Sequence, residues 1–264
     1  MGTSTSLGAI AGMALGGLSA RTDLHLNFSF GHFRIDGFSV PFFLAAILMF
    51  AALVVAWRWL PESAPAAALD PTAPPDWRRF AARLWLPLGL AAASQFGIAL
   101  FEGTFALFAQ DKLQYGPAQV GAAFMVCGLV MAIFQVPAAV LLNAYWTPYR
   151  QVWGGFTLMA SGSALLLALR AKPFVLASVA ILALGAAVIS PNLAALVSSR
   201  GGNHAGAALG AQSAANSLGQ FAGPALGGVL FAWQPTAPYA FGSAFLLSTA
   251  LLIATLSRKA GENA

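Results

Sequence analysis

The chain has 264 residues, of which 59% are hydrophobic and only 8% are charged, and its mean hydropathy is +0.75. A soluble domain carries about 25% charged residues, so this composition excludes a soluble globular protein and indicates an integral membrane protein. Its apolar runs, near 20 residues long, indicate helices rather than a β-barrel. The single cysteine excludes a disulfide framework or a cysteine metal cluster.

The net charge of +5 comes from Lys and Arg residues that are scattered through short loops between the apolar runs. This distribution is typical of topology signals and not of a nucleic-acid-binding face, so we expect the lipid bilayer and not nucleic acid as a partner.

Eight apolar runs predict about eight transmembrane helices, with Pro and Gly at the turns between them. They lie near residues 2–20, 39–59, 84–109, 117–142, 151–170, 174–197, 206–231 and 238–257. The first run lacks the charged region that a signal peptide needs, so we interpret it as a short glycine-rich span. The third and fourth runs exceed about 20 residues, and we expect them to tilt or to extend beyond the bilayer.

The longest connection, residues 60–83, holds five prolines and then the sequence Asp76-Trp77-Arg78-Arg79. This composition predicts a mobile linker that ends in a short basic, amphipathic piece at the membrane surface. The linker divides the chain into residues 1–59, with two predicted helices, and residues 84–259, with six. Eight of the 13 Lys and Arg residues fall on the same side as the linker, which places the linker and both termini in the cytoplasm.

The first two predicted helices resemble the last two. Residues 12–18 read GMALGGL and residues 223–229 read GPALGGV, and an aromatic-rich helix follows each of them, beginning at Pro41 and Pro238. A parallel repeat of this kind occurs in secondary transporters. If the last two helices are the eleventh and twelfth of a protein with two six-helix halves, the first two are the fifth and sixth, and four helices would precede Met1.

The stretch from residue 206 to residue 228 reads GAALGAQSAANSLGQFAGPALGG. It resembles the antiporter motif G-x8-G-x3-G-P-x2-G-G of the major facilitator superfamily, in which the chain is similar to bacterial drug:proton antiporters. A partial copy near the N-terminus has Met13 in place of the proline. The residues at the fixed positions are Gly210, Gly219, Gly223, Pro224, Gly227 and Gly228 in the full copy, and Gly8, Gly12, Gly16 and Gly17 in the partial one.

The resemblance implies an all-α membrane protein with a partial major facilitator fold, made of two helices of the first half and a complete six-helix second half. It further implies a multi-pass protein of the bacterial inner membrane, without enzymatic activity, catalytic residues or a cofactor. The expected function is proton-coupled efflux of drugs or other small amphipathic molecules by alternating access, with the proton gradient as the driving force. A complete relative is expected to be a monomer.

We expect this chain not to transport by itself, because the four preceding helices would form much of one wall of the transport cavity. Two alternatives remain open. One is uptake of a metabolite or sugar by the same fold, and the other is a non-transporting membrane fragment that comes from a truncated gene or a wrong start.

Three glycines, Gly219, Gly223 and Gly227, recur every four residues and line one face of the seventh predicted span without side-chain bulk. They indicate either simple helix packing or a bendable contact between the two halves of the transporter. Pro224 lacks an N–H for the helix ladder and promotes a kink beside them.

Polar residues form a second stripe on the same helix. Gln212, Asn216 and Gln220 are spaced four apart, and they indicate either interhelical hydrogen bonds or a wall of the transport cavity. Asn192 follows a proline in the middle of its span, where free backbone groups are typical of a cavity lining. Gln135 completes a row on the fourth span that also contains Phe124, Cys127 and Met131.

Glu102 alone of the eight acidic residues lies well inside a predicted span, and no Lys or Arg lies at mid-span. A carboxylate is costly there, so an intramembrane acid is by default a candidate functional residue. We expect Glu102 to carry a coupling proton or to bind a cationic drug, together with Gln95 and Phe105 nearby on the helix. The alternative is a protonated acid satisfied by backbone carbonyls, or a position near Asp111 and Lys112 at the helix end.

Other chemistry is not indicated by the sequence. It has no GxxxxGK[ST] motif, which argues against an ATP-driven pump, and no HExxH motif. His25 and His32 occur in an external loop with Asp23 and Asp36, where we expect solvated side chains and no metal site.

Overall fold

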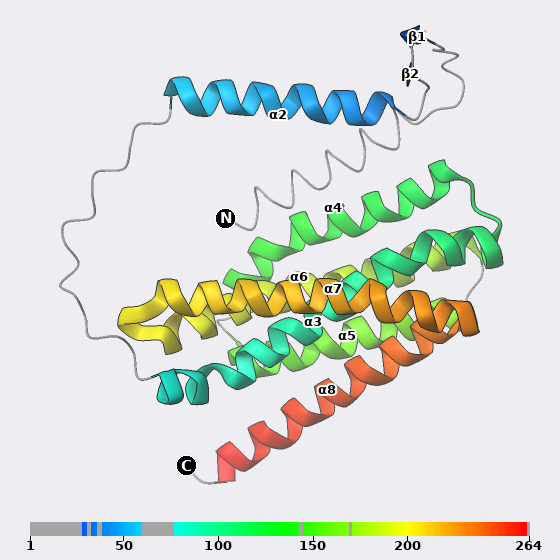
Figure 1. Cartoon of the computed structure of the whole chain (residues 1–264). Coiled ribbons are helices and arrows are strands. Elements are labelled where there is room, and N and C mark those ends of the chain that lie inside the picture. Colours follow the sequence, from blue (N-terminus) through cyan, green and yellow to red (C-terminus); the bar gives the residue numbers. More distant parts are fainter. Residues whose placement is uncertain are drawn as a thin grey trace.

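A computed structural model describes residues 28–30, 33–35, 39–59, 77–142, 145–168 and 171–262. Within these residues, long helices dominate the fold (Figure 1). They are α2 (Val40–Trp59), α3 (Trp77–Leu113), α4 (Pro117–Leu141), α5 (Pro148–Ala168), α6 (Lys172–Gly201), α7 (Ala205–Trp233) and α8 (Ala237–Glu262). Seven of the eight predicted spans are therefore helices, and the run at residues 2–20 lies outside the described part of the chain.

The helices are long and apolar enough to cross a membrane. Residues Lys172–Trp233 form one helical stretch of 62 residues, which would be about 93 Å long if it were straight. Since the hydrocarbon core is only about 30 Å thick, this stretch has to reverse direction. It does so at the 3₁₀-helix η2 (Gly202–His204), where Gly202 has a φ of +52° that glycine adopts without steric cost.

Two short antiparallel strands, β1 (Phe28–Phe30) and β2 (Phe33–Ile35), lie in the predicted external loop. Phe28 pairs with Ile35 and Phe30 with Phe33. We predicted no strands here, although alternating aromatic residues on both sides of a glycine are a hairpin signal. The His and Asp residues of the metal site that we considered in this loop lie outside the described residues.

Helix α3 begins at Trp77, seven residues before the predicted start of the span at residue 84. Its first two turns contain three arginines and no glycine or proline, so nothing in the sequence stops the helix before residue 84. At 37 residues it is about 55 Å long, which exceeds the thickness of the hydrocarbon layer. The basic piece that we predicted at the membrane surface is therefore the first part of α3.

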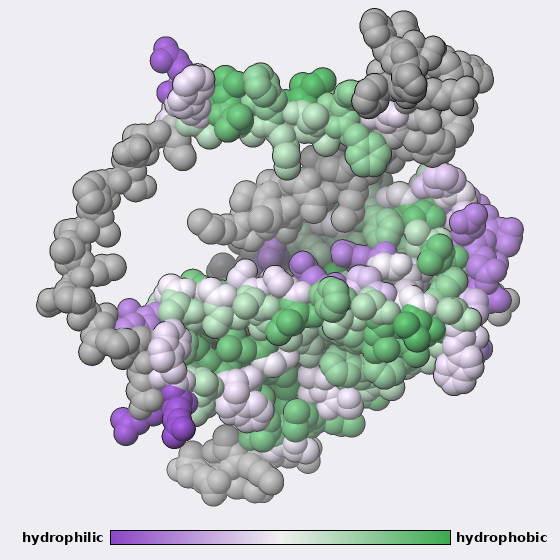
Figure 2. All heavy atoms as spheres, in the orientation of Figure 1, coloured by the Kyte–Doolittle hydropathy of each residue, from purple (hydrophilic) through white to green (hydrophobic). Residues whose placement is uncertain are grey.

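Helices α3 to α8 pack together as a bundle, whereas the described side chains of α2 are almost all exposed. In the bundle, α3 packs most closely on α7, α5 lies against both α6 and α8, and α4 packs on α6. Figure 1 shows α2 apart from these helices. Figure 2 shows hydrophilic residues at the two ends of the bundle, as expected for helices that cross a lipid layer, and further hydrophilic residues along the edge that faces α2.

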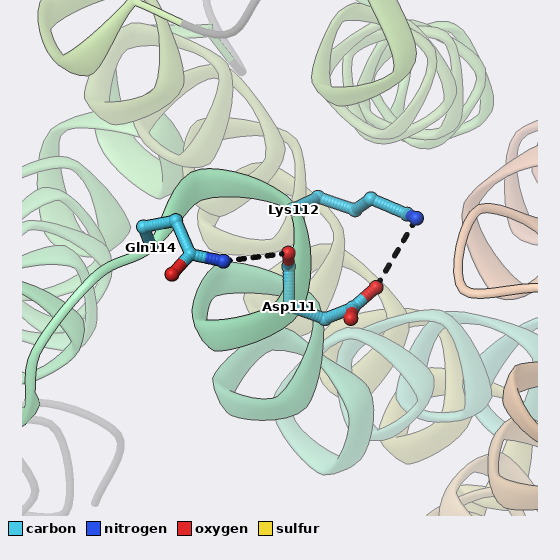
Figure 3. Close-up of polar contacts among 3 residues, drawn as sticks. All are labelled: Asp111, Lys112 and Gln114. Carbon is cyan, nitrogen blue, oxygen red and sulfur yellow. Dashed lines mark hydrogen bonds and ion pairs between the residues drawn. The ribbon is translucent and has the colours of Figure 1, made fainter.

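The turn between α3 and α4 is fixed by local hydrogen bonds. Gln114 has a φ of +55°, and its side-chain nitrogen donates to the backbone oxygen of Asp111 at 3.1 Å (Figure 3). The next amide, Tyr115 N, donates back to the oxygen of Ala109 at 3.0 Å, which is a common way to end a helix. Lys112 Nζ lies 3.2 Å from Asp111 Oδ2 in the same turn.

At the opposite end of the bundle, Arg200 joins three helices. Its guanidinium donates to the carbonyl oxygen of Arg83 at 3.1 Å and to the hydroxyl of Tyr149. The guanidinium carbon also lies 5.6 Å from the centre of the Tyr149 ring, a cation–π distance. This end, which the distribution of basic residues predicts to be cytoplasmic, is thus held by one side chain shared among α3, α5 and α6.

Candidate functional site

The candidate site begins with the contact between α3 and α7. Gly219, Gly223 and Gly227 are buried along one face of α7. A Cβ atom on Gly223 would lie 2.7 Å from the backbone nitrogen of Leu100, and one on Gly219 would collide with the carbonyl oxygen of Ala92. Only glycine permits this approach of two helix backbones, which is the usual way to pack helices where lipid gives no hydrophobic drive.

This glycine row packs within the six-helix bundle. For these three residues the structure shows a helix contact inside this bundle, and a contact between the two halves stays a prediction. Gly210 and Gly228 have no atom within 4 Å of a built Cβ, because helical periodicity turns them away from α3. The glycines of the partial copy near the N-terminus lie outside the described residues.

Pro224 adds a specific contact to this interface. A Cβ atom on Gly103 of α3 would lie 2.9 Å from the Cβ of Pro224 and 3.2 Å from its Cα. The proline of the motif therefore rests on a residue of α3 that has no side chain. Gly103 directly follows Glu102. This contact therefore fixes the backbone of α3 next to the residue that carries the intramembrane carboxyl group.

A cavity of about 340 Å³ lies beside this interface, between α3, α4, α6 and α7. Ile98, Met131 and Leu193 supply part of its apolar surface, and Cys127 contributes a thiol. Its hydroxyl, amide and carboxyl groups come from three helices, and they belong to Ser94, Gln95, Glu102, Ser190, Gln212, Asn216 and Gln220. The cavity is thus a polar pocket in an otherwise apolar bundle, and it is open on one side, because Glu102 and Gln220 are exposed.

The structure brings together four of the predicted pathway residues in this cavity: Gln95, Glu102, Gln212 and Asn216. The polar stripe of α7 faces the cavity, and α3 presents Gln95 and Glu102 from one of its own faces. Three other predicted pathway residues, Phe105, Gln135 and Asn192, do not line it.

Asn192 is buried between helices. Its Nδ2 donates to Gln151 Oε1 of α5 at 2.8 Å and to the oxygen of Val188 at 2.7 Å. Gln151 in turn donates from Nε2 to the oxygen of Trp146 at 2.9 Å. The expectation that Asn192 lines the cavity is therefore wrong, because its amide points at α5 and joins α5 to α6.

Phe105 is also part of the packed core. It is fully buried, and its ring centre lies 4.9 Å from that of Phe101 and 5.7 Å from that of Phe124. Gln135 is half-buried one helical turn beyond Met131. The three-residue spacing that suggested Phe105 as a partner of Glu102 places it on the neighbouring, core-facing side of α3.

Among the described residues that line the cavity, Glu102 supplies the one carboxyl group, and no Lys or Arg is found. Lys112 is ten residues further along α3, about 15 Å along the axis, and it pairs with Asp111 (Figure 3). The ion pair of Lys112 with Asp111 is thus at the end of α3, away from the cavity. A carboxyl group among amides and apolar side chains is suited to a proton or to an organic cation.

A bundle of membrane-spanning helices around a polar cavity with one acid defines a multi-pass membrane protein of the transporter class. The chain belongs to the major facilitator superfamily: the model of that family matches residues 1–211 and, in a second alignment, residues 88–263. Its partial fold agrees with the one that the sequence predicts.

Curated relatives of the chain are resistance proteins. Multidrug resistance protein 1 of Bacillus subtilis (strain 168) is 27% identical over 260 residues, which are 96% of this chain and 63% of that protein. Quinolone resistance protein NorA of Staphylococcus aureus (strain COL) is 27% identical over 154 residues, which are 58% of this chain and 39% of that protein. The chain therefore spans less than two thirds of the length of each of these relatives.

Proposed function

We propose that this chain belongs to a secondary transporter that expels cationic amphipathic molecules in exchange for protons. The observation that carries the proposal is Glu102, the one carboxyl group among the described residues that line the cavity, where it has no basic neighbour. The names of the two relatives, which refer to multidrug and quinolone resistance, support the efflux direction. The bacterial relatives also favour the bacterial inner (plasma) membrane as the location. The distribution of Lys and Arg favours a cytoplasmic linker and cytoplasmic termini.

In the proposed exchange, Glu102 holds either a proton or the cation. When a cation enters, the O–H bond of the acid breaks, the proton passes to water, and the carboxylate pairs with the cation. Gln95, Gln212 and Asn216 offer hydrogen bonds to polar groups of the substrate, while Met131 adapts to its apolar body. Because the two positive charges compete for one carboxylate, each is carried in the direction opposite to the other.

The conformational step would be a rocking of two helix bundles around the cavity, as in other secondary transporters. We propose that residues 84–259 form one of these bundles, that residues 1–59 contribute to the other, and that residues 60–83 connect them. The glycine contacts between α3 and α7 support this division, because they make two walls of the cavity move as one body.

Cation binding to the purified chain tests this proposal without requiring transport. We would titrate the protein with tetraphenylphosphonium in a weakly buffered detergent solution and record the heat and the proton release together. We expect the wild-type chain to release a proton for each cation bound. Glu102→Gln should abolish the release, whereas Asp111→Asn, which removes an acid at the helix end, should preserve it. Equal proton release by Glu102→Gln and wild type would overturn the proposal.

Uptake of a hydroxyl-rich metabolite is a second candidate, because four amide side chains line the cavity: Gln95, Gln212, Asn216 and Gln220. Amide groups donate and accept hydrogen bonds, so they suit sugars as well as drugs. The same titration with a panel of neutral sugars separates the two functions. Saturable sugar binding that releases no proton would favour uptake and contradict drug efflux.

A further inference from the structure

A second hollow lies on the outside of the bundle and shares no residue with the polar cavity. It has a volume of about 580 Å³ and runs between the second half of α4 and the first half of α5, with α6 as its floor. We call it the outer groove. Its walls are almost entirely apolar, and they include Phe134, Pro137, Trp146, Trp153, Leu184 and Val188.

The polar groups in the outer groove are already satisfied. Gln151, at its base, donates to the oxygen of Trp146 and accepts from Asn192. Thr157 Oγ1 donates to the oxygen of Gly154 at 2.7 Å. Since these groups need no further partner, the groove offers nothing to a water molecule or a polar ligand and suits an apolar chain.

The sequence of α5 places a cation next to the residues that line the groove. Arg150 is on the same face of α5 as Trp153, Gly154 and Thr157, three residues that line the groove, and it is exposed. Side chains in a helix lean toward its N-terminus, so a residue in the first turn of α5 is suited to direct its charge toward the end of the helix. Trp153 and Trp146 are 39% and 48% exposed, as is common for tryptophans at the lipid headgroup level.

We propose that the outer groove holds an acyl chain of an anionic phospholipid of the bilayer, and that the phosphate of this lipid pairs with Arg150. An apolar slot with a cation above it matches the two parts of such a lipid, the tail and the charged head. Arginine is suited to this role because its planar guanidinium pairs with phosphate through two parallel hydrogen bonds.

Native mass spectrometry of the purified chain tests the proposal. The protein would be mixed with equal amounts of dioleoylphosphatidylglycerol and dioleoylphosphatidylcholine, and the first retained lipid counted. We expect phosphatidylglycerol to be retained preferentially, and Arg150→Gln to lower that preference about fivefold. Gly154→Leu should lower retention of both lipids, because its side chain would occupy the groove and a Cβ there meets only the Trp146 ring, at 3.5 Å.

Two matched controls isolate the site. Arg58→Gln removes an exposed arginine on α2, and Gly89→Leu makes the same change at a position on α3 with no atom within 4 Å. Both should retain lipid as the wild type does. Equal retention of the two lipids by the wild type, or an unchanged preference in Arg150→Gln, would overturn the proposal.

Tryptophan fluorescence gives a second measurement that does not depend on the folding of Gly154→Leu. Brominated phosphatidylglycerol, added to the detergent-solubilised chain, quenches tryptophans that touch its tail. We expect Trp153→Phe to remove more of the quenching at low lipid concentration than Trp233→Phe, which alters an exposed tryptophan at the end of α7. Equal losses in the two variants would contradict a lipid in the outer groove.

Discussion

Two helix pairs in the bundle are held together by glycine, and they differ in what lies beside them. Between α5 and α6, a Cβ atom on Gly162 would lie 2.6 Å from the nitrogen of Leu182 and 2.7 Å from the oxygen of Ser178. Fully buried Phe156 and Met159 lie along the same helix, so this contact is enclosed by core. The α3–α7 contact instead borders the polar cavity. Close helix packing through glycine therefore stabilises the core between α5 and α6, whereas between α3 and α7 it also positions the candidate site.

The largest effect is expected in the enclosed contact. Gly162→Ala would place a methyl group against backbone atoms of α6, which cannot rotate away, so we expect a loss of about 3 kcal/mol or more in the free energy of unfolding. Gly154→Ala is the matched control on the same helix, because its methyl group would meet only the Trp146 ring. Unfolding in mixed micelles of dodecyl sulfate would measure both. Equal stability of the two variants would refute the close approach of α5 and α6.

A smaller loss is expected in the contact beside the cavity. Gly223→Ala would press against the Leu100 nitrogen and the Phe96 oxygen of α3, but this contact borders the cavity and is not enclosed by core, so we expect a loss of about 2 kcal/mol. Gly228→Ala, in the same motif but with no atom within 4 Å, should be close to neutral. The comparison also shows whether a motif glycine stabilises the protein through helix packing or through some other property of the motif. If the two alanine substitutions lower the free energy of unfolding equally, the motif acts through something other than helix contact.

The sequence predicted a glycine packing face on α7, but it predicted neither the partner of that face, α3, nor the α5–α6 contact. The row of Gly219, Gly223 and Gly227 has the four-residue period of a helix face, so its role is readable from spacing. Gly155 and Gly162 are seven apart on α5; Gly155 meets Gly185 of α6, whereas Gly162 lies against Leu182, so these contacts depend on how α5 and α6 pair. Pairing of distant segments is not encoded in the local pattern.

The residues that line the cavity were likewise only partly predictable from the sequence. Its α3 and α7 walls could be predicted, because Gln95 and Glu102 share a face and the polar stripe of α7 has helical spacing. Ser190 and Asn192 are two residues apart on α6, yet Ser190 lines the cavity whereas Asn192 turns toward Gln151. The sequence shows that α6 carries polar groups, but only the rotation of α6 in the bundle decides which one faces the site.

The contact between Gly103 and Pro224 offers a way to disturb Glu102 without altering it. Gly103→Ala would push against the proline ring, and we expect a loss of about 1 kcal/mol in stability and a larger fractional loss of cation-dependent proton release. Gly89→Ala, on the same helix and in open space, is the control for helix propensity. A variant that lost stability but released protons normally would show that this contact does not position the acid.

The smallest effect concerns the hydrogen bond that accompanies the enclosed glycine contact. Asn192 and Gln151 join α6 to α5 through one amide pair at 2.8 Å. Hydrogen bonds between membrane helices contribute about 0.6 kcal/mol on average, so a double-mutant cycle with Asn192→Leu and Gln151→Leu should give a coupling energy near that value. Either single change costs more than the coupling, since it leaves a buried amide without its partner. A coupling energy of several kcal/mol would mean that the amide pair, and not the glycines, holds α5 on α6, and the two contacts compared above would then differ in kind.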